Sequence, residues 1–369
     1  MGEFELLAKL RERLPPGGPR LRLGSGDDAA VTVPGGATAT SVDALVDGVH
    51  FRRRWSSPAQ IGHKALAAAL SDLAAMGAEP GEAYVVLGVP TDLEEDECIE
   101  LTDGMSAVAA ETGTALAGGD VTRAPALTLA MTVVGHAPEP AGFVTRGGGR
   151  PGDVLAVTGE LGGAAAGLLL LEQDVESRSP SVTIRKPACA AGERRTKRGK
   201  DAAPRSVSGA ARRARGFPDS HSVPGGERTA LLARQLEPWP RIAAGQALAA
   251  AGASAMIDLS DGLGGDAEHL AAASGVGLEI EAAALPVAAG VAAVAAATSR
   301  DPLELAAAAG EDYELLVALP AERFEAAVAA VRETGTTLTR IGAVAAGDGV
   351  EIRLPDGRLS KPAGFDQLG

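Results

Sequence analysis

Hydrophobic and polar positions alternate along the chain in a way that predicts strands and helices in mixed order. Short apolar runs near the start are separated by Gly and Pro, which is typical of strands joined by tight turns. We therefore expect strands at residues 21–23, 29–33, 37–42, 114–117 and 127–133. A first long helix should begin at Ser57-Pro58, where a capping residue precedes Pro, and its apolar positions keep helical spacing up to Gly77.

The second long helix and the remaining elements follow from similar signals. Thr91-Asp92-Leu93-Glu94 has the form of a capping box, and the helix that it opens should end near Gly113. A Gly-rich turn at residues 147–152 predicts a boundary between two domains, residues 1–146 and 147–369. In the second domain we expect strands at residues 154–157, 254–258, 278–280, 313–318 and 338–344, and helices at residues 162–171, 263–273 and 321–333. This alternation predicts an α/β fold.

One segment, at about residues 173–225, interrupts the pattern. Between residues 176 and 225 the chain is rich in Arg, Lys, Ser, Pro and Gly and has no apolar periodicity, which is the signature of disorder. Twelve basic residues face four acidic ones there, so the segment carries a formal +8 within a chain of −14. We interpret it as a tolerated surface insertion, because long insertions cost little. The alternatives are a basic arm that binds an anionic surface and a local frameshift in the gene.

Composition narrows the class of protein. With 369 residues the chain is too long for one typical core, which agrees with two domains. Its net charge of −14 disfavours a nucleic-acid partner, because such binding depends on Lys and Arg. Cys98 and Cys189 are the only cysteines, so neither a disulfide framework nor a cysteine zinc site is expected. No apolar run reaches the about 18 residues of a membrane span. The acidic start is unlike a signal peptide, so no membrane partner and a cytoplasmic location are expected.

Five short segments centred on aspartate carry most of the chemical information. Each sits at the end of an apolar run, which places them at the ends of separate elements. They are Gly26-Asp27-Asp28, Ser41-Val42-Asp43, Leu70-Ser71-Asp72-Leu73, Gly118-Gly119-Asp120 and Asp258-Leu259-Ser260-Asp261-Gly262. Asp beside Gly is also common in turns, so one such segment alone would say little. A convergent set of carboxylates is different, because the charges repel one another and need cations to stay ionised.

The cation that suits this pattern is Mg²⁺. It takes oxygen ligands, keeps several waters and is commonly shared between one or two carboxylates and substrate phosphates. Acidic residues on separate segments therefore indicate chemistry on a magnesium nucleotide. The usual nucleotide-binding loops are not found: Gly-rich runs at residues 24–29 and 147–152 lead into strands rather than helices, and Gly199-Lys200 has no strand before it.

Taken together, the segments resemble the thiamine-monophosphate kinase family. The matching strings occur in order and cover nearly the whole chain outside about residues 173–225. Besides the aspartate segments they include Gly48-Val49-His50-Phe51, Ile61-Gly62-His63-Lys64-Ala65-Leu66, Thr145-Arg146 and Gly310-Glu311-Asp312-Tyr313-Glu314-Leu315. The family belongs to a superfamily with aminoimidazole ribonucleotide synthetase, selenophosphate synthetase and a hydrogenase-maturation protein. The string Ser71-Asp72-Leu73-Ala74-Ala75-Met76-Gly77-Ala78 favours the thiamine member.

The resemblance implies a two-domain fold of the aminoimidazole ribonucleotide synthetase type and a homodimer whose N-terminal sheets pair into a barrel. It implies ATP-dependent conversion of thiamine monophosphate to the diphosphate with several Mg²⁺ ions. The implied catalytic and metal-binding aspartates are Asp28, Asp43, Asp72, Asp120 and Asp258. Further implied metal contacts are Ser41, Val42 and Asp261. The implied ATP contacts are Gly119, Asp120, Arg146 and Ser260, and the implied substrate contacts are His50, Glu311 and Phe365.

The chain departs from the family pattern in three places, the first being Ala309, which stands where the family often has Gly. Val121 stands where the family often has Thr, and Pro362 stands about where an aromatic residue contacts the thiamine end, with Phe365 close by. Two alternatives stay open. One is another ATP-using enzyme of the superfamily, which the string Gly310-Glu311-Asp312-Tyr313-Glu314-Leu315 disfavours. The other is a non-catalytic sensor of nucleotide or thiamine diphosphate, which the departure near Pro362 and the insertion allow. All five aspartates are retained, which favours the enzyme, because a sensor does not need a full set of metal ligands for phosphoryl transfer.

Overall fold

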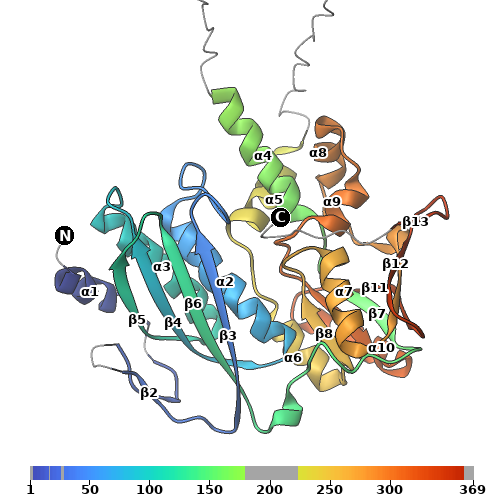
Figure 1. Ribbon diagram of the computed structural model, residues 1–369, viewed down its shortest axis with the longest axis horizontal. Coiled ribbons are helices and arrows are strands. Elements are labelled where there is room, and N and C mark those ends of the chain that lie inside the picture. Colours follow the sequence, from blue (N-terminus) through green and yellow to red (C-terminus); the bar gives the residue numbers. More distant parts are fainter. Residues whose placement is uncertain (1–2, 16, 26–28, 179–222, 361–369) are drawn as a thin grey trace, which may run out of the picture.

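The computed structural model describes residues 3–15, 17–25, 29–178 and 223–360. Within these ranges the strands form a four-stranded sheet, a seven-stranded sheet and a small two-stranded sheet (Figure 1). The four-stranded sheet lies in the N-terminal half of the chain and the seven-stranded sheet in the C-terminal half. Helices accompany both sheets, so the predicted α/β class is confirmed. The domain limits at residues 146 and 147 stay a prediction.

The N-terminal sheet has the strand order β3 (Ala37–Val46), β6 (Thr128–Ala137), β4 (Glu79–Val89) and β5 (Ala115–Arg123). Helices α2 (Pro58–Ala75) and α3 (Glu95–Thr112) cover one of its faces (Figure 1). Near the start, α1 (Glu3–Arg11) contacts α3, and β1 (Leu21–Leu23) contacts β5 and pairs with β2 (Val31–Thr32). Strands β3 and β5 are the two edges of this sheet.

Helix α2 begins where the sequence predicts. The backbone N–H of Gln60 donates to the Ser57 hydroxyl at 3.3 Å, and the N–H of Ser57 donates to the Gln60 side chain at 3.0 Å. This reciprocal pair and Pro58 at the first helical position fix the start of the helix. After Ala75 the chain turns through Gly77 at a φ of +64°, a conformation that side chains rarely adopt.

Helices α2 and α3 approach closely because glycine removes the side chain at each point of contact. A Cβ on Gly62 would lie 1.9 Å from the carbonyl oxygen of Leu101. On the opposite helix, a Cβ on Gly104 would lie 1.9 Å from the carbonyl oxygen of Ala59. The two glycines therefore set the distance between the helices, and any larger residue would push them apart.

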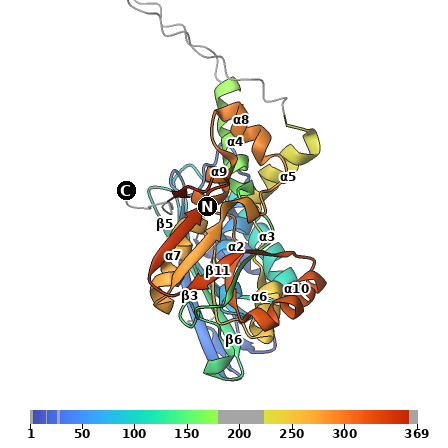
Figure 2. The same cartoon turned by 90° about the vertical axis from the view of Figure 1, so that its right-hand side faces the viewer.

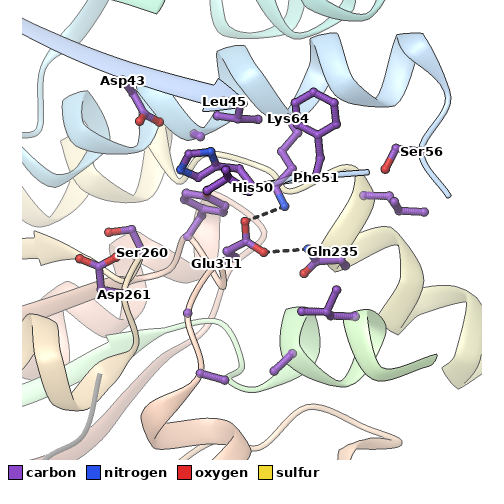
Figure 3. A pocket seen from close by; sticks show the side chains of 18 of the residues that line it. Asp43, Leu45, His50, Phe51, Ser56, Lys64, Gln235, Ser260, Asp261 and Glu311 are labelled. Atoms are coloured by element: carbon purple, nitrogen blue, oxygen red, sulfur yellow. Dashed lines mark hydrogen bonds and ion pairs between the residues drawn. The ribbon is translucent and has the colours of Figure 1, made fainter. Parts of the chain in front are cut away.

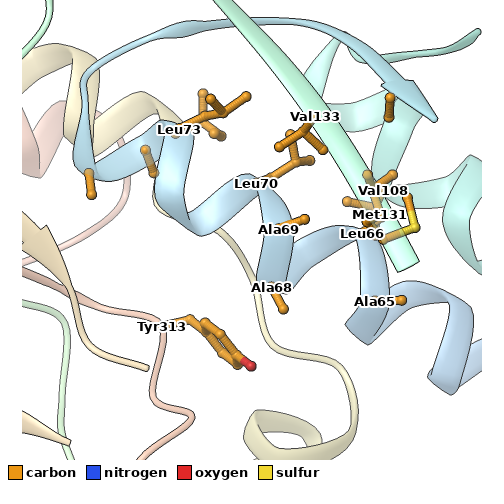
Figure 4. Close-up of a cluster of buried hydrophobic side chains, with 14 of the residues drawn as sticks. Ala65, Leu66, Ala68, Ala69, Leu70, Leu73, Val108, Met131, Val133 and Tyr313 are labelled. Carbon is orange, nitrogen blue, oxygen red and sulfur yellow. The ribbon is translucent and has the colours of Figure 1, made fainter. Parts of the chain in front are cut away.

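Helix α2 also forms the junction between the two halves of the molecule. Its Ala74 carbonyl would lie 2.0 Å from a Cβ on Gly245 in α6 (Ile242–Ala251), so this contact too depends on glycine. Leu70 points toward strand β6, whereas Ala68 points toward Tyr313 of the C-terminal half (Figure 4). One apolar cluster thus includes residues from both halves. Any polar side chain on the same side of α2 as Ala68 therefore lies between the N-terminal and C-terminal halves of the molecule.

The C-terminal sheet has the strand order β13 (Leu359–Ser360), β12 (Gly349–Arg353), β9 (Gly277–Glu281), β11 (Leu338–Ala345), β7 (Val154–Thr158), β10 (Leu315–Leu319) and β8 (Ala255–Asp258). Neighbouring strands are antiparallel except for β12 and β9, which are parallel. The buried strands β7, β8 and β10 read as continuous apolar runs because both faces are covered.

Helices cover the two faces of this sheet unequally. In the view of Figure 2, α7 (Leu263–Ser274) lies on one side, and α6 and α10 (Phe324–Glu333) lie on the other. The remaining helices gather at one end of the molecule around a small apolar cluster (Figure 1); they are α4 (Gly163–Arg178), α5 (Gly225–Leu236), α8 (Val291–Thr298) and α9 (Pro302–Ala308). None of the helices in the described ranges combines the length and the hydropathy needed to cross a membrane.

Several predicted elements need correction. Strand β3 continues to Val46 and β5 to Arg123, so Asp43 and Asp120 lie inside strands and not at their ends. Strand β4 was not expected, because its segment Glu79-Pro80-Gly81-Glu82 is unlike a strand sequence. The predicted strand at residues 29–33 is reduced to Val31–Thr32.

The helix predictions are corrected in a similar way. Helix α3 begins at Glu95 and its capping box joins Glu94 and Glu97, three residues after the expected start. Helix α4 runs to Arg178, so residues 173–178 are helical and do not belong to an irregular insertion. Residues 179–222 of the predicted insertion lie outside the described residues. Helices α5, α6, α8 and α9 were not expected.

Candidate active site

A cavity of about 410 Å³ opens between the two halves of the molecule. Its walls come from β3, the loop at residues 49–56, α2, α4, α5, the loop after β8 and the segment at residues 308–313. Figure 3 shows Asp43, Ser260 and Asp261 on one side of it and Ser56 and Gln235 on the other. We name the first side the acidic end. We name the second side the apolar end and define it by Phe51, Trp55, Ala165 and Leu168.

Four of the predicted aspartates meet at the acidic end, which we define by Asp43, Asp72, Asp258 and Asp261. Each comes from a different place: an edge strand, the junction helix α2, the end of β8 and the loop that follows it. The Ser41 hydroxyl donates a hydrogen bond to the Asp72 carboxylate, so Ser41 also lies at this end. These four aspartates therefore line the same cavity, and their role as metal ligands stays a prediction.

The acidic end carries more negative charge than its surroundings offset. Burial, with the nearby Asp72 charge as the second cause, raises the pKa of Asp258 to about 7. Burial also raises the pKa of Asp43, again with Asp72 contributing. The exposed Arg146 acts in the opposite direction and lowers the pKa of Asp258, although Arg146 is not part of the cavity lining.

This set of donors fits Mg²⁺. All the candidate ligand atoms are oxygens, and a divalent cation would offset both the burial of the Asp258 carboxylate and the nearby Asp72 charge, which together raise the pKa of Asp258. Within the described residues no three His, Cys, Asp or Glu side chains converge tightly enough to hold a metal ion by themselves. This fits a cation that takes its remaining ligands from water and phosphate oxygens. Asp28 lies outside the described residues, so its predicted role stays a prediction.

Gly119 and Asp120 do not join the other predicted residues. The pairing register puts Asp43, Met131, Val85 and Gly119 in one row across the sheet. Strands β3 and β5 are the edges, so three strand spacings of about 4.8 Å separate Asp43 from Gly119 by roughly 14 Å. Because neighbouring side chains alternate, Asp120 also points to the opposite face from Asp43. Within one chain Asp120 cannot share a metal with Asp72.

Of four other predicted site residues, three line the cavity and one lies outside the described residues. Ser260 and Val42 line the cavity, and Val42 is 69% exposed. His50 also lines it, and its Nδ1 accepts the backbone N–H of Val46 at 3.1 Å. Neutral His50 must then carry its proton on Nε2, so the ring presents a donor. Phe365 lies outside the described residues.

Glu311 sits between the two ends and is held by residues that sequence reasoning missed. Lys64, which is 4% exposed, forms an ion pair with Glu311 at 2.7 Å. Gln235 donates its Nε2–H to the other carboxylate oxygen of Glu311, also at 2.7 Å (Figure 3). Lys64 was detectable in principle, because a lysine interrupts an otherwise apolar helical stripe. Gln235 had no such signal, because its helix was not predicted.

The backbone around Glu311 adopts an unusual conformation. Glu311 has a φ of +69° and Tyr313 a φ of +49°, values that non-glycine residues rarely take. The next residues hold the segment in place. Asp312 accepts the N–H groups of Gly162 at 2.7 Å and Ala164 at 3.2 Å at the start of α4. Fully buried Glu314 accepts from Arg241 at 2.7 Å.

Two ranges of the chain match models of known protein families. Residues 26–137 match the AIR synthase related protein, N-terminal domain, and residues 216–355 match the AIR synthase related protein, C-terminal domain. The chain is 34% identical over 287 residues to thiamine-monophosphate kinase of Mycobacterium tuberculosis (strain ATCC 25618 / H37Rv). That alignment covers 77% of this chain and 70% of the relative.

Solved structures agree with the sequence comparison. Thiamine-monophosphate kinase from Stenotrophomonas maltophilia K279a is 31% identical, with a TM-score of 0.73 over 97% of this chain and 96% of that one. The structure of AaThiL complexed with AMPPCP and TMP is 29% identical, with a TM-score of 0.67 over 89% of this chain and 86% of that one. Sequence and fold therefore agree on the same relatives.

Proposed function

Since the chain belongs to the thiamine-monophosphate kinase family, we propose that it uses ATP to convert thiamine monophosphate to thiamine diphosphate. The observation that carries this proposal is the convergence of Asp43, Asp72, Asp258 and Asp261 at one end of a cavity whose other end is apolar. A substrate that carries both a phosphate and a ring system could place its metal-bound phosphate at the acidic end and its rings at the apolar end. The related AaThiL structure, complexed with AMPPCP and TMP, supports the choice of substrates.

The acceptor makes a general base unnecessary. A phosphate monoester has a second pKa near about 6, so it is largely deprotonated at neutral pH and can act as the nucleophile directly. The remaining difficulty is to bring two anionic phosphates together. We therefore propose direct in-line transfer from ATP without a phosphorylated enzyme intermediate.

We assign different roles to the residues around the cavity, namely binding of metal, substrate and ATP. Asp43, Asp72, Asp258 and Asp261 would hold several Mg²⁺ ions, with Ser41 and the Val42 backbone adding oxygen ligands. Mg²⁺ held by these residues would supply positive charge that offsets the repulsion between the two phosphates. His50 presents its Nε2–H to the cavity as a donor for the substrate. Arg146, at the edge of the acidic end, and Ser260 would contact the phosphates of ATP.

We further propose that the enzyme is a homodimer in which a second copy supplies Gly119 and Asp120. These residues are roughly 14 Å from Asp43 across one sheet, so one chain does not bring the predicted ATP site together. The face of the sheet opposite α2 and α3 includes Val42 and Val86, which are 69% and 44% exposed. Pairing two such faces would bury them. A cytoplasmic location, where ATP is available, is part of the same proposal.

The test is a direct assay with ATP, Mg²⁺ and thiamine monophosphate, followed by chromatography of the thiamine phosphates. We expect diphosphate from the monophosphate, none from free thiamine, and none after EDTA treatment. ATP binding without product would favour a sensor instead. Rapid quenching with γ-labelled ATP adds a second check, since a covalently labelled protein that forms product at a competent rate would rule out direct transfer.

A further inference from the structure

Gln235 places a hydrogen-bond acceptor with no partner at the apolar end of the cavity. The residue is 6% exposed and lines the cavity from helix α5. Its Nε2 donates to Glu311, but its Oε1 has no hydrogen-bond partner among the described residues. A buried acceptor left unpaired costs about 1–3 kcal/mol, so the position is suited to a ligand that donates a hydrogen bond.

The orientation of the Gln235 amide is set by its neighbours. Glu311 is paired with Lys64 at 2.7 Å, and a carboxylate in such a pair can only accept. The group of Gln235 that faces Glu311 must therefore be the NH₂ group, which turns Oε1 away from it. Lys64, Glu311 and Gln235 thus form a chain of fixed polarity that ends in an acceptor (Figure 3).

The surroundings of Gln235 fit a flat ring rather than a phosphate. Phe51 and Trp55 line the same cavity from the loop at residues 49–56, and Ala165 and Leu168 line it from α4. Glu172, one turn beyond Leu168 on the same helix, also lines it and makes no hydrogen bond or ion pair with the described residues. Arg52 lines the cavity as well and lies over the Trp55 ring, 5.8 Å from its centre. This end therefore offers apolar and aromatic surface with one charge of each sign beside it, which suits a flat ring better than a phosphate.

We propose that Gln235 is a specificity-determining residue that accepts a hydrogen bond from the amino group on the substrate's heteroaromatic ring. This inference rests on the proposed function, because thiamine monophosphate carries an aminopyrimidine at the end remote from its phosphate. With the phosphate at the acidic end, the amino group lies toward the apolar end, where Gln235 Oε1 is located. A ring without a donor leaves that acceptor buried and unpaired.

The test compares thiamine monophosphate with an analogue in which hydrogen replaces the ring amino group. For the wild type we expect kcat/KM to be about 10–100-fold lower with the analogue, which is the cost of an unpaired buried acceptor. In Gln235→Leu that ratio should approach one, because no acceptor remains to be satisfied, while KM for ATP stays unchanged. Gln246→Leu is the matched control, since Gln246 donates to the Ala78 carbonyl at 3.1 Å outside the cavity, and it should keep the wild-type ratio.

The outcomes separate the two proposals. A Gln235→Leu enzyme that is slower with both substrates but keeps the wild-type ratio has lost only structure, and that result overturns the specificity role. A wild-type ratio near one overturns it as well, and this measurement does not depend on whether the variant folds. If the wild type makes thiamine diphosphate but one of these two results is found, the proposed function holds and the specificity role of Gln235 fails. No diphosphate from the wild type contradicts both.

Discussion

Aspartates at the acidic end of the cavity differ in burial, and this difference decides what each substitution will do. Asp258 is 4% exposed at the end of β8, so a change there disturbs the core as well as the site. Asp72 is half-buried on α2, and the Ser41 hydroxyl is its only hydrogen-bond partner among the described side chains. Asp72 is therefore the residue at which function can be separated from folding.

We expect Asp72→Asn to lower kcat by at least about 10²–10³-fold, because an amide cannot replace a carboxylate as a ligand for Mg²⁺ beside two phosphates. Thermal unfolding should change little, since the amide keeps the shape of the side chain and its hydrogen bond with Ser41. Asp103→Asn makes the same change on the exposed face of α3, where Asp103 pairs with Arg13 at 3.1 Å, and should leave kcat intact. Near-normal turnover in Asp72→Asn would mean that the metal site is elsewhere.

Asp312 gives a prediction about pH and stability. Burial raises its pKa from 3.8 to about 7, with the Glu314 charge adding to the increase, while the N–H groups of Gly162 and Ala164 and the Arg234 charge oppose it. Since the folded pKa lies above the unfolded value, the folded state favours the protonated form. The stability contributed by Asp312 is therefore complete below about pH 4, falls as the pH rises, and is lost above about pH 7.

The measurement is the free energy of unfolding of the wild type and Asp312→Asn from pH 4 to pH 8. Relative to the variant, the wild type should lose up to roughly 4 kcal/mol across this range, which corresponds to about three pKa units. Asp301→Asn, which alters the cap of α9 where Asp301 accepts the Leu303 N–H at 2.9 Å, controls for the loss of a cap acceptor. A difference between the wild type and Asp312→Asn that does not change with pH would contradict the expectation.

At the scale of elements, the contact between α4 and α5 positions the apolar end. A Cβ on Gly167 would lie 2.2 Å from the Leu231 carbonyl oxygen and 3.0 Å from the Cβ of Gln235. Helix α5 can therefore approach α4 only because Gly167 has no side chain. Gln235 follows Leu231 by one turn, so the distance between these helices decides where its amide enters the cavity.

We expect Gly167→Ala to raise KM for thiamine monophosphate several-fold and to cost about 1–3 kcal/mol of stability, because α5 must move away. KM for ATP should not change. Gly226→Ala is the matched control: it lies in α5, where nothing stands within 4 Å of the new Cβ, and removing a helical glycine should add up to about 1 kcal/mol. Steady-state kinetics and thermal unfolding of both variants provide the check. Equal changes in KM for thiamine monophosphate and in stability in the two variants would contradict the role of Gly167.

At the scale of the whole molecule, the N-terminal sheet separates residues that the family resemblance groups together. Asp43 and Asp120 lie on opposite edge strands and on opposite faces. We propose that a second copy pairs through the exposed face that contains Val42 and Val86, and that its Asp120 then completes the cavity of the first copy. Each cavity would then contain Asp72 from one chain and Asp120 from the other.

This arrangement predicts complementation between two inactive variants. When Asp72→Asn and Asp120→Asn chains are unfolded, mixed in equal amounts and refolded, half of the dimers are mixed and each mixed dimer has one intact site. Activity should therefore return to about a quarter of the wild-type value in a two-fold dimer. Each variant refolded alone is the control and should stay inactive. No recovery in the mixture, with dimers present by size measurement, would place both residues in the same chain's site.

The sequence alone predicted which residues form the acidic end, and the chemistry expected of them stays a prediction. Apolar periodicity and capping located α2 from Ser57 onward, and the strand before Asp258 was expected where β8 lies. Asp72 and Asp258 were therefore placed correctly on their elements. Such signals are local, because a helix cap or an alternating run is set by residues a few positions apart. The resemblance then grouped the aspartates, His50 and Glu311 before any contact was known.

Only the tertiary structure decided which of these residues share one cavity. Strand β4 lies between β6 and β5 and moves Asp120 away from Asp43, yet its Glu79-Pro80-Gly81-Glu82 start gave no strand signal. Gln235 became part of the site through the packing of α5 on α4, and Lys64 through the position of α2 between the two halves. These placements depend on contacts between residues far apart in the chain, which local patterns of hydrophobicity do not contain.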